Sequence, residues 1–276
     1  MTQPSAKVAL VTGASSGMGK VIAQRLIEDG LSVIVAARSY DKMADLEALG
    51  AQRLQLDIAN EESIQKAVQN ILASHNGVDV LVNNAGFGCY GAVEDTPIDD
   101  ARYQFEVNLF GLARLTQLLL PKMREQGAGK IINISSMGGK IYTPLGAWYH
   151  ASKHALEGWS DCLRLEVAQF GIDVVVVEPG AIKTEFGNVM AEPMIQRSGN
   201  GAYGALVQKM AQLTEDSYEK GNASPPSVIA EVVSAAVKVR KPKTRYAAGK
   251  FAQPMIAIRT WLGDRIFDRL IMSMVK

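Results

Sequence analysis

Short apolar runs alternate with segments of helical periodicity along most of the chain. The runs are rich in Val, Ile and Leu, and most end at a glycine, asparagine, serine or proline, as buried strands do. Strands that alternate with helices predict a parallel sheet with helices on both faces, a doubly wound α/β fold. We expect about seven strands in a single domain that spans residues 1–276. The strand-like runs cover residues 7–12, 32–37, 53–56, 78–82, 130–135, 172–178 and 244–248.

A long helical pattern covers residues 99–124, before the run at 130–135. Its apolar positions recur at steps of three and four residues, which predicts one continuous helix with a buried stripe. Asn108 is the polar residue beside that stripe. The stripe comprises Phe105, Leu109, Leu112, Leu115 and Leu119.

The last third of the chain has a different pattern. Residues 186–224 are rich in Met, Gly, Gln and Ser, and we expect a substrate lid and binding loop there. After a helix near 227–240, the segment 250–276 predicts an amphipathic helix or pair of helices. Its polar face is mixed rather than basic, so packing on the substrate side or on a partner subunit is favoured over a membrane surface. Its apolar positions are Phe251, Met255, Ile258, Leu262, Ile266, Leu270 and Met274.

Composition narrows the classes of function. The chain has 276 residues, 47% of them hydrophobic, and a formal net charge of +1, which gives no basic face for nucleic acid. The two cysteines, Cys89 and Cys162, have no paired spacing, so neither a disulfide framework nor a zinc site is expected. The N-terminal segment, residues 1–7, is short and polar, and no apolar run in the sequence is long enough to span a membrane. We therefore expect a cytoplasmic protein that acts on a small molecule.

The first strand runs into a glycine-rich turn that opens a helix. The segment Thr12-Gly-Ala-Ser-Ser-Gly-Met-Gly19 has the spacing G-x-x-x-G-x-G. Gly13 permits a tight bend, Gly17 lets the backbone approach a ligand, and Gly19 allows close helix packing. Because a helix N-terminus attracts anions, this turn predicts a pyrophosphate site in a Rossmann-type fold.

Three polar side chains converge in the second half of the chain. Tyr149 and Lys153 are four residues apart, on one face of a helix, so the ammonium can lie near the phenol. A nearby cation favours the phenolate and brings a tyrosine toward the range of an acid/base catalyst. Ser136 follows the run 130–135 and should stand at the carboxyl end of a strand, where ligands bind in open α/β sheets.

These motifs together resemble the short-chain dehydrogenase/reductase family, over residues 7–184. The resemblance implies catalysis by Asn108, Ser136, Tyr149 and Lys153 on an alcohol or carbonyl substrate with a nicotinamide cofactor. Ser136 would hold the substrate oxygen, Tyr149 would transfer the proton, and Lys153 would lower the phenol's pKa and bind the ribose. The segments Tyr-His-Ala-Ser-Lys and Val-Glu-Pro-Gly are most similar to the branch of 17β-hydroxysteroid and retinol dehydrogenases, which is compatible with a hydrophobic substrate.

The resemblance also implies a set of cofactor contacts. Asn83 and the following residues stabilise the sheet and line the cleft, and Asp57 and Ile58 flank the adenine. Sequence alone leaves Asp57 open to a second interpretation, as the N-cap of the next helix. The implied cofactor residues are Gly13, Ser15, Ser16, Gly17, Met18, Gly19, Arg38, Ser39, Asp57, Ile58, Asn84, Ala85, Gly86, Tyr149, Lys153, Pro179, Gly180, Ile182 and Thr184.

The end of the second strand predicts NADP rather than NAD. NAD is usually selected there by an acidic residue, but this chain has Ala37 followed by Arg38. The guanidinium can bind the 2′-phosphate, with Ser15 and Ser39 as further donors. Ser16 stands where some NADP-preferring members carry a second basic residue, so the preference should be moderate.

Three alternative interpretations of the sequence are less well supported. His150, His154 and Glu157 lie on one helical face with donors that a metal accepts, but a zincin motif is missing. We interpret them as solvent-facing or interface residues and predict no metal. A non-catalytic NAD(P)-sensing protein is disfavoured because the catalytic residues are intact, and a nucleotide-sugar epimerase or dehydratase usually needs a longer C-terminal domain. The family's helices at 99–126 and 146–170 predict a homodimer or homotetramer.

Overall fold

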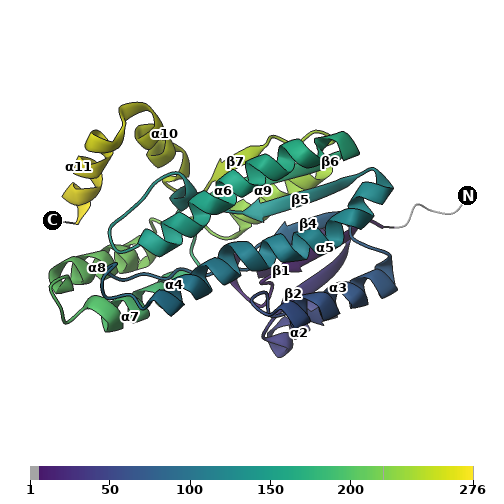
Figure 1. Ribbon diagram of the computed structural model, residues 1–276, viewed down its shortest axis with the longest axis horizontal. Coiled ribbons are helices and arrows are strands. Elements are labelled where there is room, and N and C mark those ends of the chain that lie inside the picture. The colour runs from purple at the N-terminus through teal and green to yellow at the C-terminus, as the bar shows by residue number, and fades with distance from the viewer. Residues whose placement is uncertain (1–5, 220, 276) are drawn as a thin grey trace, which may run out of the picture.

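A seven-stranded sheet forms the centre of the protein in a computed structural model that describes residues 6–219 and 221–275 (Figure 1). The strand order is β3-β2-β1-β4-β5-β6-β7, and each neighbouring pair is parallel. This confirms the predicted fold class. The strands are β1 (Val8–Thr12), β2 (Ser32–Ala37), β3 (Gln52–Gln55), β4 (Val80–Asn83), β5 (Gly129–Ile134), β6 (Ile172–Pro179) and β7 (Arg245–Ala248).

Helices cover both faces of this sheet because alternate strand residues point to opposite sides. In β1, Ala9 and Val11 belong to the core beneath α1 and α9, whereas Leu10 belongs to the core beneath α3, α5 and α6. Strands buried on both faces read as continuous apolar runs, which explains their clear signal in the sequence. The helices are α1 (Gly17–Glu28), α2 (Ala44–Ala48), α3 (Glu61–His75), α5 (Gly111–Gln126), α6 (Ala147–Val167) and α9 (Ser227–Lys238).

The helix expected over 99–124 is interrupted. It consists of α4 (Ile98–Phe105), a π-helical turn at Glu106–Phe110 and then α5. The extra residue of the π-turn rotates the inward face, so Phe105 and Leu109 are half-buried while Val107 and Asn108 point inward. The predicted stripe is therefore correct for Leu112, Leu115 and Leu119 and wrong for its first two members.

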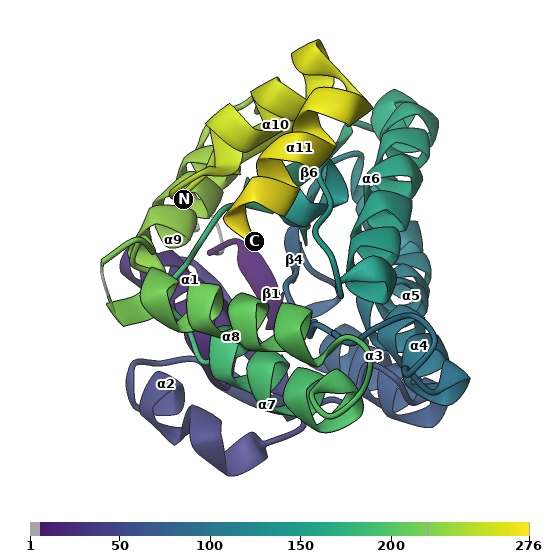
Figure 2. The same cartoon turned by 90° about the vertical axis from the view of Figure 1, so that its left-hand side faces the viewer.

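The segment expected to be a lid and loop is mainly helical. It forms α7 (Phe186–Ser198) and α8 (Gly204–Glu219), which lie at the end of the molecule shown in Figure 2. Arg197 of α7 joins this part to the body, because its guanidinium donates to Asp100 at 2.7 Å and to the Tyr90 carbonyl at 3.0 Å.

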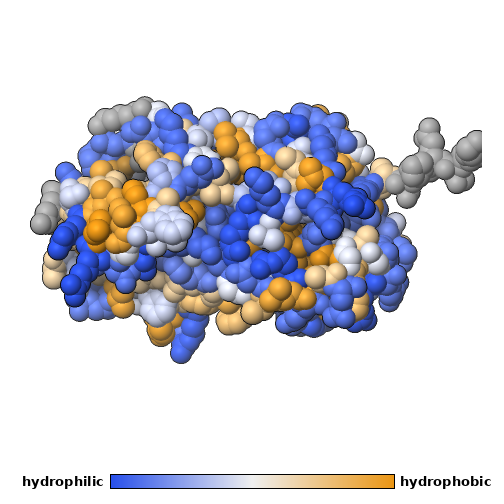
Figure 3. All heavy atoms as spheres, turned by 90° about the horizontal axis from the view of Figure 1, so that it is seen from above, coloured by the Kyte–Doolittle hydropathy of each residue, from blue (hydrophilic) through white to orange (hydrophobic). Residues whose placement is uncertain are grey.

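The C-terminal segment forms a pair of helices, α10 (Ala252–Leu262) and α11 (Asp264–Met274). Of the two predicted alternatives, one helix or a pair, the structure has the pair, but the buried residues differ from the predicted stripe. Phe267 and Ile271 pack against Ile141, while Leu262, Ile266 and Met274 are exposed. Figure 3 shows an apolar patch over this part of the molecule. Within residues 6–219 and 221–275, no helix is long and apolar enough to cross a membrane.

Gly111 lets α5 touch the backbone that follows β3. A Cβ at this position would lie 1.9 Å from the carbonyl oxygen of Ile58. Gly111→Ala should therefore lower the free energy of unfolding by about 1–3 kcal/mol, measured by denaturant titration. Gly201→Ala, where an added Cβ meets no atom within 4 Å, is the control. A Gly111→Ala protein as stable as wild type would contradict this packing.

Candidate active site

The turn between β1 and α1 is shaped to hold an anion. Gly13 and Gly17 have φ of +66° and +55°, a region that glycine adopts at no steric cost. A Cβ on Gly19 would lie 2.4 Å from the Asn84 side-chain nitrogen, so a larger residue would push α1 away. The turn and the start of α1 line a cavity, where free backbone amides can bind a pyrophosphate.

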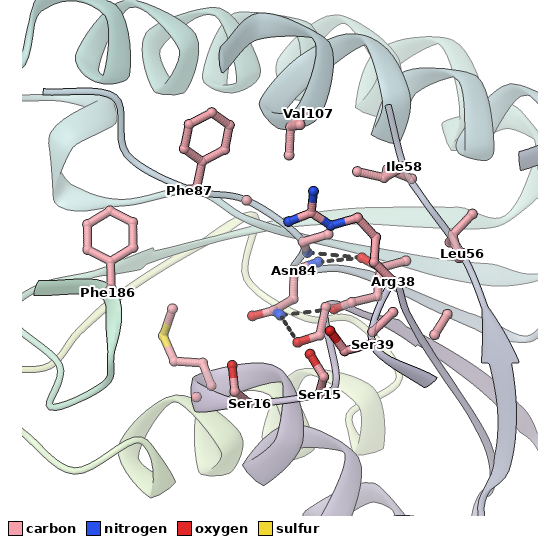
Figure 4. Close-up of a pocket in the computed structure, with 18 of the residues that line it drawn as sticks. Ser15, Ser16, Arg38, Ser39, Leu56, Ile58, Asn84, Phe87, Val107 and Phe186 are labelled. Atoms are coloured by element: carbon pink, nitrogen blue, oxygen red, sulfur yellow. Dashed lines mark hydrogen bonds between the residues drawn. The ribbon is translucent and has the colours of Figure 1, made fainter. Parts of the chain in front are cut away.

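This cavity has a volume of about 330 Å³ and brings together most of the predicted cofactor residues. Figure 4 shows Phe87 and Phe186 at one end of it and Leu56 and Ile58 at the other, with Ser15, Ser16, Arg38, Ser39 and Asn84 between. Gly19 contributes through packing rather than as a lining residue. The predicted residues that line the cavity are Gly13, Ser15, Ser16, Gly17, Met18, Arg38, Ser39, Asp57, Ile58, Asn84, Ala85, Gly86 and Thr184.

Arg38 is held over the cavity by Tyr103. Its Nη1 donates to the Tyr103 hydroxyl at 3.0 Å, and Tyr103 itself lines the cavity from α4. Asp57 lines the same cavity, and its carboxylate accepts from the amide of Ala59 at 3.0 Å. Asp57 is not the N-cap of α3, because Asn60 takes that role by accepting from the Ser63 amide.

The two asparagines after β4 have separate roles. Asn83 is buried and donates to Asn133 at 2.9 Å, so it joins β4 to β5 inside the core. Asn84 lines the cavity and donates to the Thr12 carbonyl at 2.9 Å, which ties the β4 edge to the glycine-rich turn. Thr12 also accepts from the Asn84 amide at 3.0 Å through its hydroxyl.

Asn108 lies in the π-turn, and its side chain is fully buried. It accepts from the Phe87 amide at 3.1 Å, and it donates to the Phe87 carbonyl at 3.0 Å and to the Ser152 hydroxyl at 3.1 Å. A π-turn in a helix often marks a functional site, and here it aims an amide toward α6. Asn108 therefore connects the loop after β4 to the helix that carries Tyr149 and Lys153.

Lys153 reaches from α6 to the end of β5. Its ammonium donates to the Ile134 carbonyl at 2.9 Å, and a Cβ added to Gly86 would be 3.7 Å from it. Burial lowers the pKa of Lys153 to about 8, while the Glu157 carboxylate acts in the opposite direction. Because the pKa stays above neutral pH, the ammonium keeps its proton there.

Tyr149 and Ser136 line a second cavity together with Lys153. The Tyr149 ring packs between Tyr90 and Phe186, each with ring centroids 5.6 Å away. Ser136 caps the turn at Met137–Gly139 by accepting from the Gly138 amide at 3.0 Å. A hydroxyl used as an acceptor can still donate its proton to a substrate oxygen.

The second cavity adjoins the first, since Met18, Gly86 and Phe186 are among the residues that line both. The end of β6 and the loop after it provide the residues predicted to contact the nicotinamide: Pro179, Gly180, Ile182 and Thr184. The remaining wall is largely apolar and comes partly from α7 and α8. Its larger apolar residues are Phe87, Tyr90, Met137, Phe186, Met190 and Met210.

The histidine and glutamate face of α6 was misjudged. His154 is exposed, but His150 and Glu157 are buried, so the expectation of solvent-facing or interface residues is wrong for these two. His150 Nε2 accepts from the Thr143 amide at 3.1 Å, which leaves Nδ1 to donate to the Gly138 carbonyl at 2.9 Å. Burial lowers its pKa to about 4, so it is neutral near pH 7. Across the described part of the chain, no group of three or more His, Cys, Asp or Glu side chains is placed to hold a metal.

Sequence reasoning missed several residues that form the site. Tyr103 accepts a hydrogen bond from Arg38, while Phe87 and Phe186 line both cavities. Phe87 directly follows the segment 83–86 and Phe186 comes two residues after Thr184, so their positions beside predicted cofactor residues were a usable signal. Tyr103 belongs to a helix far from Arg38 in sequence and carried no comparable signal.

Comparison with known proteins gives a consistent result. A family model described as short chain dehydrogenase matches residues 7–194. A 3-ketodihydrosphingosine reductase from Bacteroides thetaiotaomicron is 35% identical over 265 residues, which cover 95% of each chain. A short-chain dehydrogenase from Streptomyces avermitilis is similar in structure, with a TM-score of 0.80, 35% identity and coverage of 98% of this chain and 99% of that one. An actinorhodin polyketide ketoreductase with NADPH has a TM-score of 0.72 and 34% identity, covering 88% of this chain and 94% of the other.

Proposed function

This chain belongs to the short-chain dehydrogenase/reductase family, and from that premise we propose that it is an NADP-dependent enzyme that interconverts a hydrophobic secondary alcohol and its carbonyl form. Family membership makes the chain an oxidoreductase that acts on an alcohol or carbonyl group with a nicotinamide cofactor. The main support for the proposal is that Ser136, Tyr149 and Lys153 line one cavity. This cavity adjoins the one formed by the glycine-rich turn.

Each polar residue has a distinct task in this proposal. When bound, the nicotinamide gives or takes the hydride. Ser136 donates a hydrogen bond to the substrate oxygen and holds the reacting carbon in place. Tyr149 transfers a proton to or from that oxygen, and the charged Lys153 stabilises the phenolate. Asn108 fixes the loop and helix on which this geometry depends.

The lining of the second cavity supports an uncharged, apolar substrate. Among the described residues that line it, Lys153 is the sole charged side chain, and it is engaged by the Ile134 carbonyl. Methionine side chains at 137, 190 and 210 offer an adaptable apolar wall. The relative named 3-ketodihydrosphingosine reductase supports the same class of substrate.

A substrate panel tests the proposal. NADPH oxidation would be followed with 3-ketodihydrosphingosine, ketosteroids, retinal and medium-chain ketones, beside polar controls such as keto acids and ketoses. We expect turnover with apolar carbonyls and at least about tenfold lower kcat/KM with charged ones, because a charge in this cavity would lose its hydration without a partner. Preference for charged substrates, or NADPH binding without turnover of any carbonyl, would contradict the proposal. The second result would favour a cofactor-sensing protein.

Arg38 should determine the preference for NADP. The guanidinium lines the cofactor cavity, Tyr103 holds it there, and Ala37 leaves no carboxylate to repel a phosphate. Hydrogen bonds to a charged group contribute about 1.5–3 kcal/mol, so wild type should favour NADPH over NADH by roughly tenfold to a hundredfold in kcat/KM. The Ala37→Asp, Arg38→Ala double variant should lose or reverse this ratio. An unchanged ratio, or a wild type that favours NADH, would show the assignment to be wrong.

We also propose a homodimer or homotetramer in the cytoplasm. Apolar side chains on the expected interface helices are exposed in the single chain, with Phe110 54% and Leu165 74% accessible. Sedimentation velocity should show an oligomer, and Leu165→Glu should shift it toward monomer. The control is Trp261→Glu, which places the same charge at an apolar residue on α10 that is 82% exposed. If Trp261→Glu rather than Leu165→Glu dissociates the oligomer, the C-terminal helices form the interface instead.

A further inference from the structure

Two glutamates are buried on α6 and β6, close in sequence to residues of these elements that line the second cavity. Glu157 lies on α6, one helical turn after Lys153, and Glu178 lies near the end of β6, just before Pro179. Their side chains are 4% and 5% exposed. Carboxylates are rarely buried this deeply without a partner for each charge, so their presence beside the site needs a physical reason.

The cations around the two glutamates satisfy them unequally. Glu157 Oε2 forms ion pairs with Lys140 Nζ and Arg245 Nε, each at 3.1 Å. Arg245 is also bound to Asp161 at 2.6 Å, and Asp161 in turn pairs with Arg164. Glu178 Oε1 lies 3.4 Å from Arg245 Nε and accepts no hydrogen bond from the described residues.

One oxygen on each glutamate lacks a hydrogen-bond donor. Oε1 of Glu157 and Oε1 of Glu178 are both buried and find none among the described residues. The two carboxyl groups nevertheless border the same guanidinium, because Arg245 Nε lies 3.1 Å from Oε2 of Glu157 and 3.4 Å from Oε1 of Glu178. Two ionised carboxylates cannot hydrogen-bond, whereas a carboxylic acid can donate to a carboxylate. A single proton held between them supplies the missing donor.

Electrostatics lead to the same arrangement. Burial and the Glu157 charge raise the pKa of Glu178 to about 7. Glu157 in turn acts to raise the pKa of Lys153, opposing the effect of burial. The charged groups around the two glutamates are Lys153 and Asp161 from α6, Arg245 from β7 and Lys140 from the loop after β5.

We propose that Glu157 and Glu178 are positioning residues that share one proton and hold Lys153 in its charged form. The inference rests on the proposed function, in which the charge of Lys153 stabilises the Tyr149 phenolate and binds the cofactor ribose. Below neutral pH the cluster keeps one negative charge. As the pH rises, the shared proton leaves, and Glu157, which lies one helical turn from the lysine, keeps its full negative charge. The negative charge near Lys153 is thus retained in the pH range where the lysine would otherwise lose its proton.

The test is a direct titration of Lys153 in the full-length protein. Lysine labelled with ¹³C at the ε-carbon would be followed by NMR, with the Lys153 signal assigned from its loss in Lys153→Arg. The variants are Glu157→Gln, Glu178→Gln and the double variant. Glu166→Gln, an exposed glutamate on the same helix, is the control.

We expect Lys153 to titrate near pH 8 in wild type and in Glu166→Gln. Each single variant should lower that midpoint, and the double variant should lower it by about one pH unit or more. The pH above which NADPH affinity falls should decrease by the same amount as the Lys153 midpoint in each variant. A correctly folded double variant with an unchanged Lys153 midpoint would overturn the inference.

A general loss of affinity at all pH values, with no shift of the midpoint, would also overturn it, because that result describes a structural role. The NMR titration needs no substrate, so its outcome is separate from that of the carbonyl panel. A wild type without turnover would refute the proposed function while the titration still decides the role of the glutamates.

Discussion

Tyr149→Phe should lower kcat by about two to four orders of magnitude, the usual contribution of a positioned general acid or base. The substitution removes one oxygen from a ring that packs between Tyr90 and Phe186, so the ring should keep its place and the cavity its shape. NADPH affinity should change little, because the glycine-rich turn and Arg38 are untouched. The checks are steady-state kinetics with the best carbonyl from the panel and cofactor binding by fluorescence.

Tyr90→Phe is the matched control for this variant. Its ring borders the same cavity, 5.6 Å from that of Tyr149, so it loses the same atom without losing the proton donor. Activity within a few-fold of wild type is expected for Tyr90→Phe. If Tyr149→Phe were as active as this control, the proton would have to come from another group and the mechanism would be wrong.

Lys153→Met should impair both cofactor binding and turnover. The variant removes the ammonium that donates to the Ile134 carbonyl and lies next to Gly86, but it keeps a side chain of similar length in the buried site. Loss of a charged hydrogen-bond donor costs about 1.5–3 kcal/mol, so the Kd for NADPH should rise by roughly tenfold to a hundredfold. The kcat should fall as well, since the phenolate of Tyr149 loses its stabilising charge.

The pH dependence of NADPH binding separates this role of Lys153 from simple packing. In wild type, the affinity should decline as the pH passes about 8, where the buried lysine loses its proton. The Lys153→Met protein should show no such decline. A Lys153→Met variant with wild-type Kd and kcat, or with the same alkaline decline, would refute both assigned roles.

The sheet could be predicted from the sequence because each strand is buried on both faces and therefore reads as a continuous apolar run. The grouping of the proposed catalytic residues was also predictable, because Tyr149 and Lys153 depend on local helix geometry and Ser136 on the end of a strand. Their positions together in one cavity with the cofactor residues agree with that reasoning. The π-turn at Asn108 was not predictable, since one inserted residue changes which side chains face inward without changing composition.

Burial on α6 and α11 could not be predicted either, because it depends on distant partners. His150 is covered by the loop at 138–143, and Glu157 is matched by Arg245 from β7, 88 residues away. Helical periodicity marked Ile266 and Met274, but the tertiary contact with Ile141 selects Phe267 and Ile271 instead. A periodic pattern shows that a helix has an apolar face, whereas the neighbouring elements determine which residues of that face are covered.

We propose that the enzyme moves a hydride between the nicotinamide and the carbonyl carbon of an apolar substrate, while Tyr149 transfers the proton. Mass spectrometry of the alcohol formed with NADPH deuterated at the transferable C4 position tests it most directly. The account predicts one deuterium on the carbinol carbon of the product from wild type, and product formation about two to four orders of magnitude slower from Tyr149→Phe. An alcohol without deuterium, or formed equally fast by both proteins, would contradict it.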